Sequence, residues 1–179
     1  MFFGVKNGFL LYNVAMEIKI IAAVVSVLAV AAFAVSVPFR IRMFVRKYGS
    51  PVRKAVPGKQ KTAPVVLVLC AAVSAAAWFA PVSAVMSVVI CLCGIIGAEI
   101  SAAELVRSGV CGVYGKCVAA PGGTVLYSDI VNFPPSDSSS VLFVVTSGHG
   151  QVGLSFASAD ECSSVLSEIL RIRPELASE

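Results

Sequence analysis

Charged side chains are missing from two long stretches of this chain. No Asp, Glu, Lys or Arg occurs from Ile20 to Phe39, or in the 36 residues from Ala63 to Ala98. Charged residues make up 13% of the sequence, whereas about 25% is usual for a soluble domain. A helix of about 20 apolar residues crosses the hydrocarbon core of a bilayer. The missing charge therefore excludes an ordinary soluble protein and predicts a membrane protein.

Residues that carry chemistry are also scarce. The only histidine is His149, which we expect at an exposed turn, and the six cysteines include no Cys-x-x-Cys pair. A structural zinc site needs about four such ligands in a closed set. Ser128–Asp129 has no neighbouring histidine, and Gly122–Gly123 reads as a turn that lacks the lysine of a phosphate-binding loop. We therefore expect no catalytic, cofactor-binding or metal-binding residue, and no enzyme activity.

The uncharged stretches predict three transmembrane helices. The first begins near Asn13 and ends at Pro38. As one helix, the stretch 63–98 would be about 54 Å long, which exceeds a hydrocarbon core of about 30 Å. Two short helices with a turn near Pro81 fit better, and they place Trp78 at the headgroup level that tryptophan prefers. One tilted helix is the alternative.

Small side chains recur within these helices. Ala22 and Ser26, and Ala32 and Ser36, form small-xxx-small pairs, and alanine dominates 71–77. Such residues let helix backbones approach closely inside a membrane. The pattern fits packing of the three helices on one another, or an interface between copies of the chain.

A block of positive charge separates the first two helices. It contains no acidic residue, and its eight basic residues are Arg40, Arg42, Arg46, Lys47, Arg53, Lys54, Lys59 and Lys61. Residues 99–179 carry nine acidic and four basic side chains. Beside apolar spans, a basic block favours a cytoplasmic loop that contacts anionic lipid headgroups, and not nucleic acid. The N-terminus is then outside and the tail is cytoplasmic. A signal peptide cleaved near Ala34 is the rival interpretation.

The start of the basic block has one apolar face. Ile41, Phe44, Val45 and Tyr48 recur at helical spacing, and Gly49 follows them. This pattern predicts either a short amphipathic helix at the lipid interface or a continuation of the first span. The residues that we expect at the membrane interface are Arg40, Arg42, Arg46, Lys47, Tyr48 and Trp78.

The tail has the pattern of a small α+β domain. Five strands are predicted, at 110–118, 124–127, 130–133, 141–146 and 151–156. An amphipathic helix follows them. Ser158 and Glu161 have capping-box spacing, Val165 and Ile169 lie on its apolar stripe, and Pro174 ends it.

This order resembles the bacterial pleckstrin-homology-like domains tethered to short membrane hairpins, a group largely without assigned function. The resemblance covers about 109–173 and rests on Gly112–Lys116, Tyr127–Ile130, Gly153–Phe156 and the helix 159–171. It implies a curved sheet with one open end plugged by the helix. Five strands stand where the full domain has seven, so the sheet is either partial or completed by another chain. Phosphoinositide binding is not implied, because Lys116 is the only lysine of this region.

The resulting organisation has four parts: an N-terminal segment and first span (1–39), a basic cytoplasmic loop (40–62), a transmembrane hairpin (63–98) and a cytoplasmic domain (99–179). We expect a multi-pass protein of the bacterial inner membrane that performs no chemistry and acts as a binding or regulatory module of a membrane assembly. Its partner would be a protein or a second copy, bound either at an exposed sheet edge containing Val141, Phe143 and Val145 or in the groove beside the C-terminal helix. The alternative is a subunit of a transporter or channel, against which the uncharged spans count.

Overall fold

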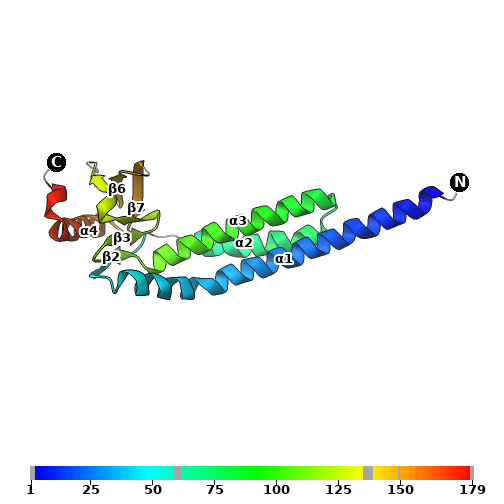
Figure 1. Ribbon diagram of the computed structural model, residues 1–179, viewed down its shortest axis with the longest axis horizontal. Coiled ribbons are helices and arrows are strands. Elements are labelled where there is room, and N and C mark those ends of the chain that lie inside the picture. Colours follow the sequence, from blue (N-terminus) through cyan, green and yellow to red (C-terminus); the bar gives the residue numbers. More distant parts are fainter. Residues whose placement is uncertain (1–2, 59–61, 135–138, 149, 178–179) are drawn as a thin grey trace. The chain divides into compact units, whose positions relative to one another are not determined.

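The computed structural model describes residues 3–58, 62–134, 139–148 and 150–177 (Figure 1). The chain divides into two compact units. The helical unit comprises Met1–Ser36 and Thr62–Ala102, and the sheet unit comprises Val37–Lys61 and Ala103–Glu179. Each unit is therefore built from two segments that are far apart in the sequence.

Three helices are long and apolar enough to cross a membrane. They are α1 (Phe3–Tyr48), α2 (Thr62–Phe79) and α3 (Ala84–Gly109). The chain turns between α2 and α3 at 80–83, so the prediction of two helices around Pro81 is confirmed. One tilted helix over 63–98 is excluded.

Helix α1 does not end at Pro38, and that prediction is wrong. Proline removes one helical hydrogen bond and costs about 3 kcal/mol in a helix interior. Beyond it, Ile41, Phe44 and Tyr48 pack against a buried cluster of the sheet unit. Each apolar side chain buried in this way contributes about 1.5–3 kcal/mol if burial is complete, which is enough to continue the helix. The helix ends as predicted before Gly49, whose φ is +84°.

The sheet unit contains seven strands in its described part, arranged in two antiparallel sheets. One sheet has the order β1 (Arg53–Lys54), β2 (Gly112–Val113), β3 (Cys117–Ala120) and β4 (Gly123–Leu126). The other has the order β5 (Ile130–Asn132), β6 (Val141–Thr146) and β7 (Gly150–Ser155), with a short 3-10 helix, Tyr127–Asp129, before it.

The prediction of five strands is therefore wrong for two reasons. The stretch 110–118 turns back on itself, because the Tyr114 amide donates to the Cys117 carbonyl at 2.8 Å and separates β2 from β3. The other missing strand, β1, comes from the segment expected to be a basic loop. Arg53 pairs with Val113, and Pro57 forms an isolated bridge with Phe156, which links the two sheets.

Helix α4 (Ala159–Ile172) covers the core of this unit, and a 3-10 turn, Pro174–Ala177, follows it. Val165 and Ile169 are fully buried among the sheet residues. Ser158 caps the helix by accepting the Glu161 amide at 3.2 Å. The carboxylate of Glu161 accepts the amide of Val56 at 3.2 Å. The predicted capping helix is present, and Glu161 also connects it to the segment that follows β1.

Gly122 provides a test of this packing. It lies in the turn between β3 and β4 with a φ of +102°, and an added Cβ would stand 2.0 Å from the carbonyl oxygen of Gly153. We expect Gly122→Ala to lower the free energy of unfolding by about 1–3 kcal/mol, because both the backbone conformation and the close approach favour glycine. Denaturant unfolding of the full chain in detergent measures this change.

The matched control is Gly115→Ala. Gly115 also lies in a turn of the sheet unit, but an added Cβ there has no atom within 4 Å. Equal stability of the two variants would show that the β3–β4 turn does not pack on β7 as described.

Candidate functional site

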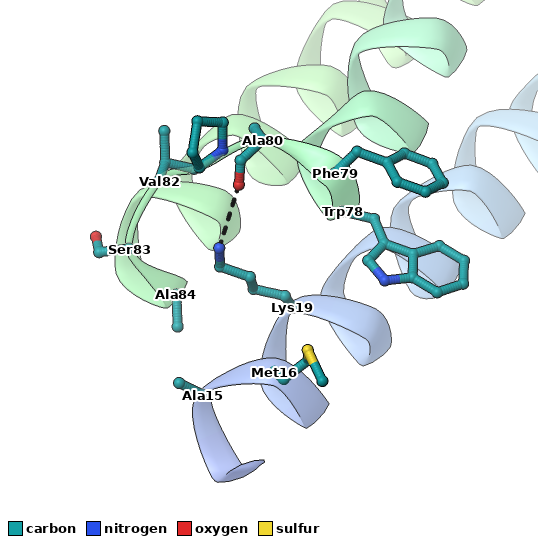
Figure 2. Close-up of a pocket in the computed structure, with 10 residues that line it drawn as sticks. Ala15, Met16, Lys19, Trp78, Phe79, Ala80, Val82, Ser83 and Ala84 are labelled. Atoms are coloured by element: carbon teal, nitrogen blue, oxygen red, sulfur yellow. Dashed lines mark hydrogen bonds between the residues drawn. The ribbon is translucent and has the colours of Figure 1, made fainter. Parts of the chain in front are cut away.

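A hollow of about 460 Å³ lies at the turn between α2 and α3 (Figure 2). Lys19 of α1 reaches across it, and its Nζ donates to the carbonyl oxygen of Ala80 at 3.3 Å. The last carbonyls of a helix have no partner within that helix, and a cation is favourable there. Lys19 therefore stabilises the end of α2 within the helical unit.

Aromatic side chains share this end of the helical unit. Trp78 and Phe79 stack with their ring centroids 5.3 Å apart, and 46% of Trp78 is exposed. Glu17, two residues before Lys19 in α1, is also exposed. A tryptophan at a helix end with a lysine beside it is typical of a membrane–water interface. The structure thus places Trp78 at a helix end beside the turn, and its depth in a bilayer stays a prediction.

The core of the helical unit is made of small and hydroxyl-bearing side chains. Ser26 and Ser74 are fully buried, and their Oγ atoms lie 2.8 Å apart. Ser26 Oγ also lies 3.1 Å from the carbonyl oxygen of Cys91. An added Cβ at Gly94 would stand 2.5 Å from Ser74 Oγ. These contacts place Ser26 in packing within one chain, whereas Ala32, of the second small pair, is exposed.

The predicted interface residues of α1 lie on its last turns. Arg42, Arg46 and Lys47 are exposed, and Arg40 and Tyr48 are half-buried. Of the remaining basic block, Lys59 and Lys61 lie outside the described residues. The exposed cations place positive charge on the last turns of α1, and whether they contact lipid stays a prediction.

The apolar face of the same turns is covered by protein. The ring of Phe44 lies 5.3 Å from that of Tyr114 in an edge-on arrangement, and 4.7 Å from that of Tyr48. Tyr114 is buried, and its hydroxyl donates to the carbonyl of Val110 at 2.8 Å. Of the two interpretations of residues 40–49, the continuation of α1 is therefore confirmed. Tyr48 packs within the sheet unit on its inward side, so it is not simply an interfacial aromatic residue.

The expected partner surface lies on β6, which is the central strand of its sheet. The prediction that Val141, Phe143 and Val145 form an exposed edge is wrong, because β6 pairs with β5 on one side and β7 on the other. These three side chains instead share the outer face of that sheet. Phe143 is 37% exposed, whereas Leu142 and Val144 point into the core. The sequence showed that inward and outward residues alternate along β6, but it did not show that β6 has a neighbouring strand on both sides.

The thiols of the sheet unit are buried. Burial, together with the smaller effect of the negative charge of Glu161, raises the pKa of the Cys111 thiol to about 12. Burial also raises the pKa of Cys117 to about 11, against the smaller opposing effect of Lys47. Since the thiolate is the reactive form of cysteine, both groups are poor nucleophiles at neutral pH.

Of the other polar candidates, only Ser128 and Asp129 lie within the described residues. The hydroxyl of Ser128 donates to the carboxylate of Asp129 at 2.8 Å on the surface. His149 lies outside the described residues. Within the part of the chain that the structure describes, no group of three or more His, Cys, Asp or Glu side chains could hold a metal ion.

Comparison of the chain with protein-family models, with curated proteins and with solved structures found no match. Kinship with the pleckstrin-homology-like domains accordingly stays a prediction from the sequence. Function has to be inferred from the burial, charge and contacts of the described residues.

The buried thiols predict a dependence of stability on pH. In the unfolded chain a cysteine thiol has its ordinary pKa of 9.0. In the folded chain the pKa values of Cys111 and Cys117 are higher, so these thiols keep their protons to a higher pH. The stability that the two buried thiols contribute is therefore complete below pH 9. It is lost as the pH rises, because the unfolded chain then gives up protons that the folded chain retains. We expect the free energy of unfolding to fall by about 1.4 kcal/mol per thiol between pH 8 and pH 10.

Urea unfolding of the full chain at the two pH values measures this fall. The double variant Cys111→Ala and Cys117→Ala is the control, and it should lose stability at both values but show a shallower pH dependence. An unchanged slope in the double variant would mean that these thiols are not the groups that titrate.

Proposed function

We propose that the protein is a non-enzymatic membrane protein whose sheet unit binds a protein partner within a membrane assembly. The observation that carries this proposal is the apolar outer face of the three-stranded sheet. Its exposed or half-buried apolar side chains are Val131, Val141, Phe143 and Val145. A sheet with one face on the core usually alternates apolar and polar residues, with the polar ones outward. Here both faces of β6 are apolar.

The geometry of this face leaves Phe143 available. Phe143 pairs across the strands with Gly153, which has no side chain to cover it. An added Cβ at Gly153 would stand 3.3 Å from both Phe143 and Val141, so these side chains lean over the glycine. Exposed aromatic residues at the centre of an apolar patch often dominate the free energy of binding.

The surroundings of the patch favour a protein partner over a lipid surface. The neighbouring outward positions are Asn132, Gln151 and Ser155, which pair with Val145 and Val141 and carry no charge. A surface that inserts into anionic lipid needs lysine or arginine around its apolar centre. An uncharged polar rim around an apolar centre is the usual anatomy of a protein–protein interface.

The pairing of β1 with β2 supports the proposed topology. Residues 53–54 precede α2, and residues 112–113 follow α3, yet they form one sheet. Both segments must then lie on the same side of a membrane that α2 and α3 cross as a hairpin. The basic side chains of residues 40–54 favour the cytoplasmic side of a bacterial inner membrane by the positive-inside rule.

The seven strands and α4 support the proposed pleckstrin-homology-like fold. A four-stranded and a three-stranded antiparallel sheet, with one C-terminal helix that buries Val165 and Ile169 in the core, match the arrangement that the resemblance implies. With β1 supplied from the same chain, no second chain is needed to complete the sheet.

We propose no enzyme activity for this chain, and the buried thiols of Cys111 and Cys117, which stay protonated at neutral pH, are consistent with that proposal. The alternative, a transporter or channel subunit, gains no support from the helical unit. Its described core is closed by small buried residues that include Ala23, Ser26, Ser74 and Ala77. These side chains leave no charged group in the core to carry an ion or a proton.

A substitution on the outer face tests the proposed partner binding. A photoreactive amino acid at position 143 should cross-link the full chain to a protein in native membranes. In chains without the photoreactive residue, we expect Phe143→Glu to lower co-purification of that protein about 30-fold, which corresponds to about 2 kcal/mol for a central aromatic residue.

Leu126→Glu is the matched control, because Leu126 is exposed to 36% and lies on the other sheet. It should leave recovery unchanged. Cross-links only between two copies of the chain, or equal recovery with both variants, would contradict a partner on the outer face. The denaturation midpoint of Phe143→Glu shows whether the sheet unit is still folded.

Reporter fusions test the topology. A reporter fused after Glu179 should give the cytoplasmic signal, and one inserted at Val82 in the α2–α3 turn should give the opposite signal. We expect this because residues 53–54 and 112–113 share a sheet and the intervening helices form a hairpin. Equal signals from the two fusions would contradict the proposed crossing of α2 and α3.

A further inference from the structure

The hollow at the α2–α3 turn adjoins an apolar groove of the helical unit. The hollow of about 460 Å³ and the groove of about 350 Å³ share two lining residues, Trp78 and Phe79. The rest of the groove is lined by aliphatic side chains of α1 and α2, which are Ala23, Val24, Val27, Leu28 and Ala75. A space with a cation and a space without polar side chains therefore meet at one pair of aromatic rings.

The two spaces follow one face of α1. Lys19 lines the hollow, whereas Ala23 and Val27 line the groove. Residues four apart lie on the same side of a helix and each residue adds about 1.5 Å, so this path is about 12 Å long. A molecule that lies along this face would contact the charge at one end and aliphatic side chains along the rest of its length.

The positive charge of Lys19 is not compensated within the hollow. Its Nζ donates to the carbonyl oxygen of Ala80, which is neutral, and an ammonium group has three donors (Figure 2). The described residues that line the hollow include no Asp or Glu. Glu17 is two residues before Lys19 in α1, and helical residues at that spacing do not face each other. The hollow therefore offers a positive charge with further N–H donors.

We propose that the hollow and the groove together bind one anionic phospholipid, with its phosphodiester at Lys19 and part of an acyl chain in the groove. Lysine binds phosphate as a point charge. The indole N–H of Trp78 and the hydroxyl of Ser83 are further donors in the lining. Ser83 Oγ accepts the amide of Met86 at 3.3 Å, which leaves its own proton to donate. A soluble anion would leave the groove empty, and an uncharged lipid would leave Lys19 without a counter-charge.

This proposal rests on the proposed crossing of a membrane by the helical unit. A bilayer supplies phosphodiester groups at the level where apolar helix surface gives way to charge, with acyl chains on the apolar side. Reporter fusions test the crossing without reference to bound lipid. The outer face of the sheet unit shares no residue with the hollow or the groove, so partner binding and lipid binding are tested separately.

The charged end of the lipid site is tested at Lys19 in the full chain. Lys19→Gln removes the charge but keeps an N–H donor for the Ala80 carbonyl, and Lys19→Arg keeps both. Native mass spectrometry in detergent, with phosphatidylglycerol as the probe, counts bound lipid. We expect Lys19→Gln to weaken binding about tenfold and Lys19→Arg to change it less than about threefold, because hydrogen bonds between charged groups are the stronger ones. Equal binding by the two variants would overturn the proposal.

The apolar end is tested by filling the groove. Ala75→Phe adds a ring to the groove lining, and Ala76→Phe, the matched control, adds the same ring at an exposed position outside both linings. We expect Ala75→Phe to weaken binding of phosphatidylglycerol about tenfold, because the ring displaces the buried acyl chain, and Ala76→Phe to leave it unchanged. Both alanines are exposed, so this pair decides the outcome even where Lys19→Gln destabilises the helices. Equal loss in both variants would contradict the site.

Two further ligands identify what the site recognises. Diacylglycerol has the acyl chains without the phosphate, and we expect it to bind more weakly than phosphatidylglycerol and to be insensitive to Lys19→Gln. Soluble glycerophosphoglycerol has the phosphodiester without the chains and should not displace the intact lipid. Displacement by glycerophosphoglycerol at the concentration of the lipid would assign the hollow to a soluble anion and overturn the proposal. Equal binding of diacylglycerol and phosphatidylglycerol by the unsubstituted chain would also overturn it.

Discussion

The sheet unit depends on the backbone pairing of Arg53–Lys54 with Gly112–Val113. This pairing joins the segment before α2 to the segment after α3 and supplies the first strand of the four-stranded sheet. It requires a close approach, since an added Cβ at Gly112 would stand 2.5 Å from the carbonyl oxygen of Arg53. The segment before α2 contributes only these two strand residues, so β1 forms only when the two segments are brought together.

Buried polar groups then connect the strands to the end of α3. Tyr127 donates its hydroxyl to the carbonyl of Tyr114, and Tyr114 donates its own to the carbonyl of Val110, each at 2.8 Å. Both rings are almost completely buried, so an unpaired hydroxyl there would cost about 1–3 kcal/mol. In the helical unit, the buried hydroxyl groups of Ser26 and Ser74 likewise form a hydrogen bond with each other. In both units these hydroxyl groups specify the packing.

Two surfaces of the sheet unit differ in their chemistry. The outer face of β5–β6–β7 is apolar with an uncharged rim, and a groove between α1, α3 and β4 combines arginine with apolar walls. A protein partner is proposed for the first of these surfaces. Because the residues involved are different, the two surfaces can be altered separately.

Local patterns in the sequence determined the features that depend on near neighbours in the chain. The missing charge defined three apolar helices, Pro81 marked the turn between two of them, and the alternation of 141–146 and the stripe of 159–172 defined β6 and α4. Hydrophobic period and helix-end signals act over a few residues, which is why a single sequence contains them.

Contacts between distant segments decided the rest. Two residues, Arg53 and Lys54, show no strand pattern and form β1 only because Gly112–Val113 lies beside them. Pro38 stays within α1 because Phe44 and Tyr48 find a buried cluster beyond it. The central position of β6 and the meeting of Arg40, Arg107 and Thr124 depend on the order of the strands and on the packing of helices. Local sequence carries no signal for these arrangements, because their free energy comes from burial and pairing that exist only in the folded chain.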